Sequence, residues 1–137
     1  MSGRWFIGVS AIALLAASPG RGEDLPQGGQ VVAGSARIEQ QGGASLTVFQ
    51  TSPRAILNWN TFNLGEGGRL RFENGRGVTL NRDLGGHPSR IDGALTATGS
   101  VYLINPAGVI VGPAGTISTG GGFLASTLGL PDADFLR

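Results

Sequence analysis

The sequence has no cysteine and no lysine, and it has only one histidine. Without cysteine the chain can form neither disulfides nor thiolate metal sites, and it has no thiol nucleophile. Charged residues make up only 14% of the 137 residues, whereas 40% are hydrophobic. This balance excludes ordinary intrinsic disorder, which combines low hydrophobicity with high charge. The formal net charge of +1 gives no support for nucleic acid as a partner.

Glycine is abundant, with 25 residues, but it follows no three-residue period, which excludes a collagen helix. A helical period of 3.6 residues is almost absent from residue 25 onward. Short apolar or alternating runs recur there instead, separated by glycine-rich turns. The pattern predicts an all-β fold with strands at Val31–Ala33, Ala36–Gln40, Ser45–Gln50, Arg54–Trp59, Arg69–Phe72, Val78–Asn81, Ser100–Ile104, Val109–Val111 and Thr116–Ser118.

Residues 1–22 have the layout of a secretory signal peptide. Arg4 lies in a short first region, and Phe6–Ala17 carries no charge. The segment that follows, residues 18–22, has the small residues Gly20 and Gly22 near the expected cut. The apolar run is shorter than the roughly 20 residues that span a bilayer. We therefore predict a signal peptide over residues 1–22, cleaved after Gly22, and a mature domain over residues 23–137.

Two corner-like segments, Asn105–Gly108 and Gly112–Gly115, enclose the apolar run Val109–Val111. They are too short to connect parallel partners within one flat sheet. Proline also forbids the positive φ that two-residue hairpin turns need. Each corner is therefore predicted to bend the chain onto a new face, so that every strand pairs with its counterpart one coil, roughly 20 to 25 residues, away. This is the layout of a parallel β-helix.

The two corners differ in their first residue. Asparagine suits the first position of a type I turn, and the side chain of Asn105 can bond the backbone two residues further on. Gly112 offers no such side chain. We therefore predict that the second corner is the less constrained of the two.

No group of residues supports catalysis. Arg69 and Arg71 alternate with apolar residues, which favours a solvated strand face over an anion site. His87 has no partner residues in a site-like pattern, and neither a phosphate-binding loop nor a zinc motif is present. A catalytic site built from acidic residues would need clustered carboxylates. The candidates do not cluster on a predicted strand; they are Glu66, Glu73, Asp132 and Asp134. We predict no catalytic residues, no metal and no cofactor.

Six segments, taken in order, resemble the N-terminal secretion (TPS) domain of two-partner secretion exoproteins, also called the haemagglutination activity domain of filamentous haemagglutinins. The central segment is GSVYLINPAGV. The residues of the six segments are most similar to the branch of high-molecular-weight adhesins and haem-haemopexin-binding exoproteins. The segments cover Leu25–Gly29, Ile56–Gly65, Leu80–Arg82, Pro88–Leu95, Gly99–Val109 and Gly122–Leu128.

The resemblance implies a right-handed parallel β-helix with an N-terminal cap. It also implies export by the Sec machinery into the periplasm, followed by passage through a partner outer-membrane barrel. The POTRA domains of that barrel would recognise this domain, and the product would be secreted or displayed on the bacterial surface. Such exoproteins are much longer than this chain, so we expect it to be truncated at its C-terminus. A host-surface ligand would then be bound by the missing part.

The resemblance further implies a secretion motif. The family's Asn-Pro-Asn-Gly sequence falls on Asn105, Pro106, Ala107 and Gly108, where Ala107 replaces an asparagine. Asp83 also stands where the family pattern suggests an apolar residue. The other candidate residues for recognition by the transporter are Asn58, Trp59, Phe62, Asn81 and Arg82.

A free-standing adhesin or carbohydrate-binding β-solenoid module is the alternative function. It would use Trp59, Phe62 and Tyr102 as an aromatic platform. Because large aromatic side chains are most often buried, we expect Trp59 and Phe62 to lie in the core or the cap instead.

Overall fold

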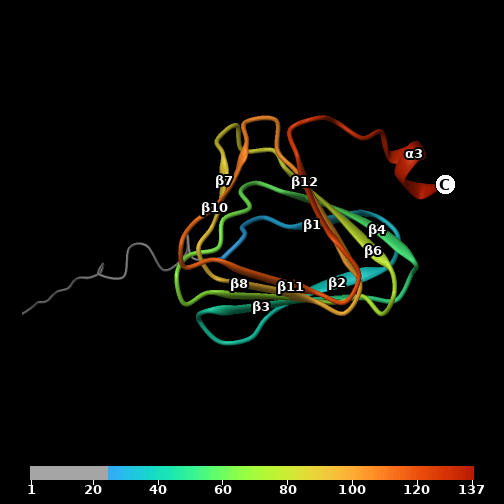
Figure 1. Cartoon of the computed structure of the whole chain (residues 1–137). Helices are drawn as coiled ribbons and strands as arrows, with labels where there is room; N and C mark the ends of the chain where they lie inside the picture. Colours follow the sequence, from blue (N-terminus) through green and yellow to red (C-terminus); the bar gives the residue numbers. More distant parts are fainter. Residues whose placement is uncertain (1–24) are drawn as a thin grey trace, which may run out of the picture.

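The structure is a computed structural model that describes residues 25–137. The predicted signal peptide and its cleavage site lie outside the described residues. In these residues, twelve strands and one short helix form a coil with three faces (Figure 1). The strands are β1 (Gln30–Ala33), β2 (Ala36–Gln40), β3 (Ser45–Gln50), β4 (Arg54–Trp59), β5 (Arg69–Glu73), β6 (Val78–Asp83), β7 (Ser89–Ile91), β8 (Ala94–Ala97), β9 (Ser100–Ile104), β10 (Val109–Val111), β11 (Thr116–Thr119) and β12 (Phe123–Ser126), and the helix is α3 (Asp132–Leu136).

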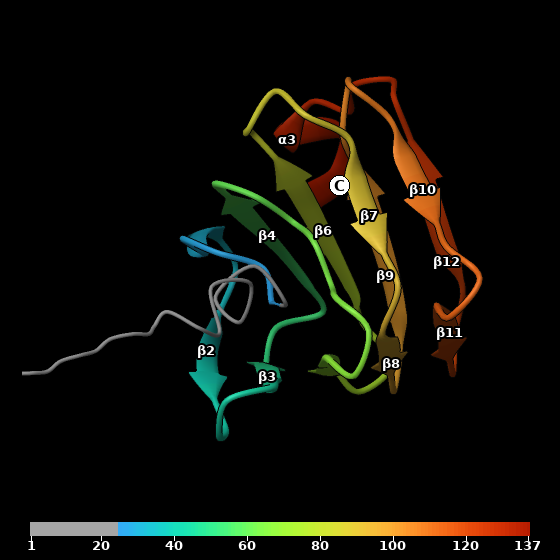
Figure 2. The same cartoon turned by 90° about the vertical axis from the view of Figure 1, so that its left-hand side faces the viewer.

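Three sheets make the three faces. Sheet 1 has the order β1-β4-β6-β9-β12, sheet 2 the order β11-β8-β5-β3-β2, and sheet 3 contains β10 and β7. The chain visits sheet 2, then sheet 1, then sheet 3, and repeats this path, so that successive coils stack side by side (Figure 2). Strands of neighbouring coils pair in parallel. The predicted parallel β-helix is confirmed.

The register gives the coil length. Arg54 pairs with Val78, which is 24 positions further on, and Val78 pairs with Ser100, another 22 positions on. Both values lie within the predicted range.

The N-terminal strands close the first coil. β1 pairs antiparallel with β4, and β2 pairs antiparallel with β3, which confirms the predicted cap. Leu25 is buried beside them. Gly29 lies so close to the indole ring of Trp59 that an added Cβ would be 2.5 Å from it. The absence of a side chain at Gly29 therefore allows the cap to seal this tryptophan.

The core is a column of inward side chains that runs through the stacked coils. In β5, Leu70 and Phe72 are fully buried, whereas Arg69 and Arg71 are exposed, as the alternation predicted. Arg71 pairs with Glu73 on the outer surface. The buried hydrophobic residues of this column are Leu25, Leu46, Val48, Ala55, Leu57, Trp59, Phe62, Leu64, Leu70, Phe72, Ile91, Leu95, Ala97, Val101 and Leu103.

All nine predicted strands are present, but four elements were not predicted: β7, β8, β12 and α3. The three strands have only three or four residues each. β8 is built mainly of alanine and threonine, so its apolar signal is weak. Each becomes a strand because a neighbouring coil supplies its hydrogen-bonding partner. Among residues 25–137 no helix is long and apolar enough to cross a membrane.

Candidate functional site

The corner Asn105–Gly108 is fixed by its first residue. The backbone N–H of Gly108 donates to the carbonyl oxygen of Asn105 at 2.9 Å, which closes the turn. The N–H of Ala107 donates to Oδ1 of Asn105, also at 2.9 Å. This second bond is the side-chain contact that the sequence predicted. Asn105 itself is fully buried, so its side chain acts inside the solenoid.

The amide nitrogen of Asn105 connects this corner to the coil below. Nδ2 donates to the carbonyl oxygen of His87 at 2.8 Å and to Oγ of Ser89 at 2.9 Å. Ser89 is completely buried and donates in turn to Oδ2 of Asp83 at 2.7 Å. The side chains of Asn105 and Ser89 are fully buried, so the bond between them is shielded from water. Loss of that bond would leave buried polar groups with one partner fewer.

Asp83 extends the same network to the preceding coil. Its Oδ2 accepts the backbone N–H of Phe62 at 2.9 Å, and its Oδ1 accepts that of Gly85 at 2.8 Å. The side chain is 3% exposed. An apolar residue at this position would leave the N–H of Phe62 without this acceptor. The departure from the family pattern at Asp83 therefore has a structural role, and we call the chain Phe62–Asp83–Ser89–Asn105 the corner network.

Trp59 and Asn81 form a second buried pair. The indole Nε1 of Trp59 donates to Oδ1 of Asn81 at 2.9 Å, and Nδ2 of Asn81 donates to the carbonyl oxygen of Tyr102 at 3.2 Å. Trp59 also packs edge-on against Phe62, with ring centroids 5.7 Å apart. Trp59, Phe62 and Asn81 are at most 1% exposed. The predicted burial of both aromatic rings is confirmed, and neither can form a carbohydrate platform in the folded domain.

Asn58 and Arg82 lie side by side on the outer face of sheet 1, where they are register partners. The guanidinium of Arg82 is 2.6 Å from Oδ1 of Asp132 and donates to the carbonyl oxygen of Leu130 at 2.5 Å. Oδ1 of Asn58 is buried and has no hydrogen-bond partner among the residues that the structure describes. Arg82 thus contacts the C-terminal segment, and neither Asn58 nor Arg82 takes part in the hydrogen bonds of the corner network.

Only the tip of the first corner reaches solvent. Pro106 and Ala107 are exposed, and with Leu84 they border a hollow of about 500 Å³. Leu84 is 62% exposed, which is unusual for so large an apolar side chain. Of the four residues in the predicted motif, the two central ones are therefore accessible in the folded protein and the asparagine is not.

The second corner has the same backbone closure but no side-chain bonds. The N–H of Gly115 donates to the carbonyl oxygen of Gly112 at 3.0 Å. Pro113 and Ala114 are exposed, like their counterparts in the first corner. This difference agrees with the prediction that the second corner is less constrained.

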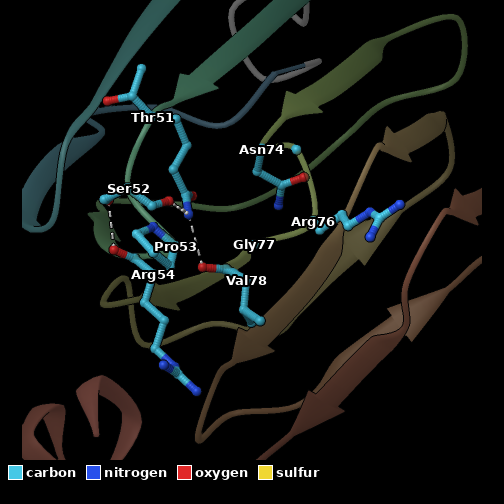
Figure 3. Close-up of a pocket in the computed structure, with 10 residues that line it drawn as sticks. Thr51, Ser52, Pro53, Arg54, Asn74, Arg76, Gly77 and Val78 are labelled. Atoms are coloured by element: carbon cyan, nitrogen blue, oxygen red, sulfur yellow. Dashed lines mark hydrogen bonds between the residues drawn. The ribbon is translucent and has the colours of Figure 1, made fainter.

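A further hollow, of about 430 Å³, lies where sheet 2 turns into sheet 1 (Figure 3). Gln50 is one of the residues that line it. Its Nε2 donates to the carbonyl oxygens of Ser52, at 2.8 Å, and Val78, at 3.1 Å. Arg54 and Arg76 extend away from the hollow in different directions (Figure 3). The two guanidinium groups do not point toward a common position, so the hollow does not form an anion site. Gln50 connects the two turns that border the hollow.

The sequence reasoning missed two polar residues that fix corners. Ser89 is the link between Asp83 and Asn105, and nothing in its surroundings in the sequence indicates this. Asn74 is 3% exposed, and its Oδ1 accepts the N–H of Gly99 at 2.7 Å. The Asn-Gly pair at residues 74–75 is a turn signal that could have identified Asn74. Over residues 25–137, no three histidine or acidic side chains gather as a metal site would require.

Comparison with known proteins identifies the family of this β-helix. The sequence model of the TPS secretion domain matches residues 23–135. Two proteins of Haemophilus influenzae named heme/hemopexin-binding protein are 39% and 40% identical to the chain, over 73% and 76% of its length. The crystal structure of the HMW1 secretion domain from Haemophilus influenzae superposes with a TM-score of 0.73 and 32% identity, covering 81% of this chain and 30% of that one.

The chain therefore belongs to the TPS secretion domain family. It is an N-terminal export domain of a two-partner secreted exoprotein of the adhesin and haem-binding branch. Domains of this family engage a partner transporter, and their exoproteins are secreted or displayed at the cell surface. The family is one of secretion domains and not of enzymes. The chain spans only 11% of the length of the curated relatives that it matches.

Proposed function

We propose that this domain is recognised by the POTRA domains of its partner barrel in the periplasm, after Sec export, while it is unfolded or only partly folded. The observation that supports this order of events is the burial of the candidate motif. Trp59, Asn81 and Asn105 are at most 1% exposed in the folded coil. A partner could touch these side chains only before the coil closes over them.

Strand addition is the mode of recognition that suits such a chain. An unfolded segment offers backbone N–H and C=O groups that can extend a sheet of the partner, with side chains supplying specificity. Once the coil forms, the N–H groups at the motif are taken: those of Ala107 and Gly108 bond to Asn105, and Pro106 has none. Folding outside the cell would then remove the recognised form and make export one-way.

The first experiment tests the need for the partner. The exoprotein segment is expressed with its cognate barrel, without it, and with a barrel that lacks the POTRA domains. Secretion into the medium is expected only with the intact barrel. Equal secretion in the three strains would overturn the proposal.

The second experiment tests the order of recognition and folding. Purified POTRA domains are mixed either with the folded domain or with the same domain freshly diluted from urea, and binding is followed before refolding is complete. We expect the urea-diluted domain to bind and the folded domain to bind weakly. Tighter binding of the folded domain would contradict recognition before folding.

A further inference from the structure

The three central strands of sheet 1 bury apolar side chains on both sides of the sheet. Its outer surface carries Ile56, Leu80 and Ile104, which are 0%, 0% and 4% exposed. These residues come from three successive coils, on β4, β6 and β9. Ile56 pairs with Leu80, and Leu80 pairs with Tyr102, while Ile104 lies two residues further along β9 as the partner of Arg82. These four side chains belong to one apolar cluster on the outside of the sheet, which we call the outer row. Something outside the coil must therefore cover them.

The cover is the segment of residues 127–136, which we call the strap. After β12 the chain turns back, and α3 lies outside the β-helix next to sheet 1 (Figures 1 and 2). Leu130 and Phe135 of the strap pack against the outer row. The ring of Phe135 meets Tyr102 edge-on, with centroids 5.9 Å apart. Because the row spans three coils, its binding surface exists only after those coils have stacked.

The side-chain polar contacts between the strap and the three covered strands come from one residue. Arg82 binds the carboxylate of Asp132 and the carbonyl oxygen of Leu130. Its side chain is 19% exposed, so these contacts are partly shielded from water. Within residues 25–137 no other side chain of β4, β6 or β9 makes a polar contact with the strap. We call these two contacts of Arg82 with the strap the latch.

The strap has little stability of its own. α3 has five residues, and Pro131 at its N-cap makes no side-chain capping bond. Helices this short do not persist in water without tertiary packing. The coils, in contrast, are joined by continuous ladders of hydrogen bonds. Segments with few contacts open at lower free-energy cost than the parts they cover.

We infer that the strap is a releasable cover, latched by Arg82, which opens and exposes the outer apolar row of sheet 1 while the β-helix stays folded. The latch thereby controls access to an apolar surface that the closed domain conceals. This inference concerns the chain alone and is independent of recognition by the transporter, so its failure would leave the proposed function untouched.

The absence of cysteine permits a direct test, because one introduced thiol is the only one present. Ile104 and Leu103 are neighbours that face opposite sides of sheet 1, the first under the strap and the second in the core. The variants Ile104→Cys and Leu103→Cys are labelled with a thiol reagent under native conditions. The free energy of opening from each labelling rate is compared with the same variant's free energy of unfolding in urea.

If the strap opens alone, Ile104→Cys is labelled faster than its global unfolding allows, whereas Leu103→Cys is labelled only at the rate of global unfolding. Should Ile104→Cys fail to fold, Leu80→Cys reports on the same covered row. Labelling limited by global unfolding at the covered position would overturn the inference, because the strap would then be an inseparable part of the fold.

The latch is tested in the Ile104→Cys background. Asp132→Asn removes a half-exposed ion pair and is expected to speed labelling about two- to fivefold. Arg82→Gln also removes the charged bond to Leu130, and about tenfold is expected. Arg71→Gln, which breaks a more exposed ion pair on sheet 2, away from the strap, is the control and should leave the labelling rate unchanged. Equal effects of Arg82→Gln and Arg71→Gln would exclude a latch at Arg82.

Discussion

The two Pro-Ala-Gly corners, Asn105–Gly108 and Gly112–Gly115, have the same last three residues and the same closing hydrogen bond, at 2.9 and 3.0 Å. They differ in how they are anchored. Asn105 reaches into the β-helix and binds the coil below, whereas Gly112 lies over the side chain of Asp92 without a side chain of its own. The comparison shows that a similar sequence can make a corner that is part of the core and another that is only a bend.

The difference also separates two roles within the secretion motif. The asparagine of the first corner is a structural residue in the folded domain, while its proline and alanine are exposed and equivalent to those of the second corner. Exchanging matched residues of the two corners therefore distinguishes stability from recognition.

The largest effect is expected for Asn105→Ala. The change leaves the buried hydroxyl of Ser89 with one partner fewer, and it removes the bonds to the carbonyl oxygen of His87 and to the N–H of Ala107. The free energy of unfolding should fall by about 3 kcal/mol. Urea denaturation of the purified domain, followed by circular dichroism, measures it. A loss as small as that of the second-corner variants would show that the corner network does not stabilise the fold.

Gly112→Ala should have an intermediate effect. A Cβ at this position would lie 1.7 Å from Oδ1 of Asp92, so the carboxylate must rotate and its ion pair with Arg90 must break. That pair is partly exposed, and the expected loss is about 1 kcal/mol. The double variant Gly112→Ala with Arg90→Gln is the control. If the ion pair accounts for the loss, the effect of Gly112→Ala shrinks in that background.

The proline pair Pro106→Ala and Pro113→Ala should have small and equal effects on stability, about 0.5 kcal/mol each, because both residues are exposed and both restrict the unfolded chain. Secretion through the cognate barrel should nevertheless fall for Pro106→Ala alone, if the first corner is the recognised motif. Quantifying the secreted and periplasmic fractions decides this. An equal fall in both variants would mean that the transporter does not read the first corner.

The smallest effect is expected for Ala107→Asn, which restores the residue found in the family motif. Ala107 is exposed, so stability should change by less than about 0.5 kcal/mol. Secretion through the barrel should rise slightly, whereas Ala114→Asn in the second corner should leave it unchanged. A decrease with Ala107→Asn would indicate that this branch has replaced the asparagine contact with another.

Local chemistry made part of the site predictable. The turn at Asn105 and its bond to the N–H of Ala107 span two residues, so the sequence contains everything that they require. The bonds of Asn105 to His87 and Ser89 span 18 and 16 residues. No pattern in one segment specifies such pairs, because the register between coils brings them together.

The strap and the outer row illustrate the same limit. Strands β4 and β9 are apolar on both faces, so alternation cannot tell which side chains face the core and which are covered from outside. The helix α3 is too short to give a periodic signal. Both features arise because Leu130 and Phe135 pack against strands that lie far earlier in the sequence.

The sequence by itself determined the class of fold, the positions of the corners and the family, since strand pattern, turn residues and ordered motifs are local properties. The tertiary structure alone decided which motif residues are buried, how the corner network connects three coils, and which face the strap covers. The physical reason is that the parallel strands of this β-helix pair residues that are 20 to 25 positions apart in the sequence, so contacts between coils are set by stacking.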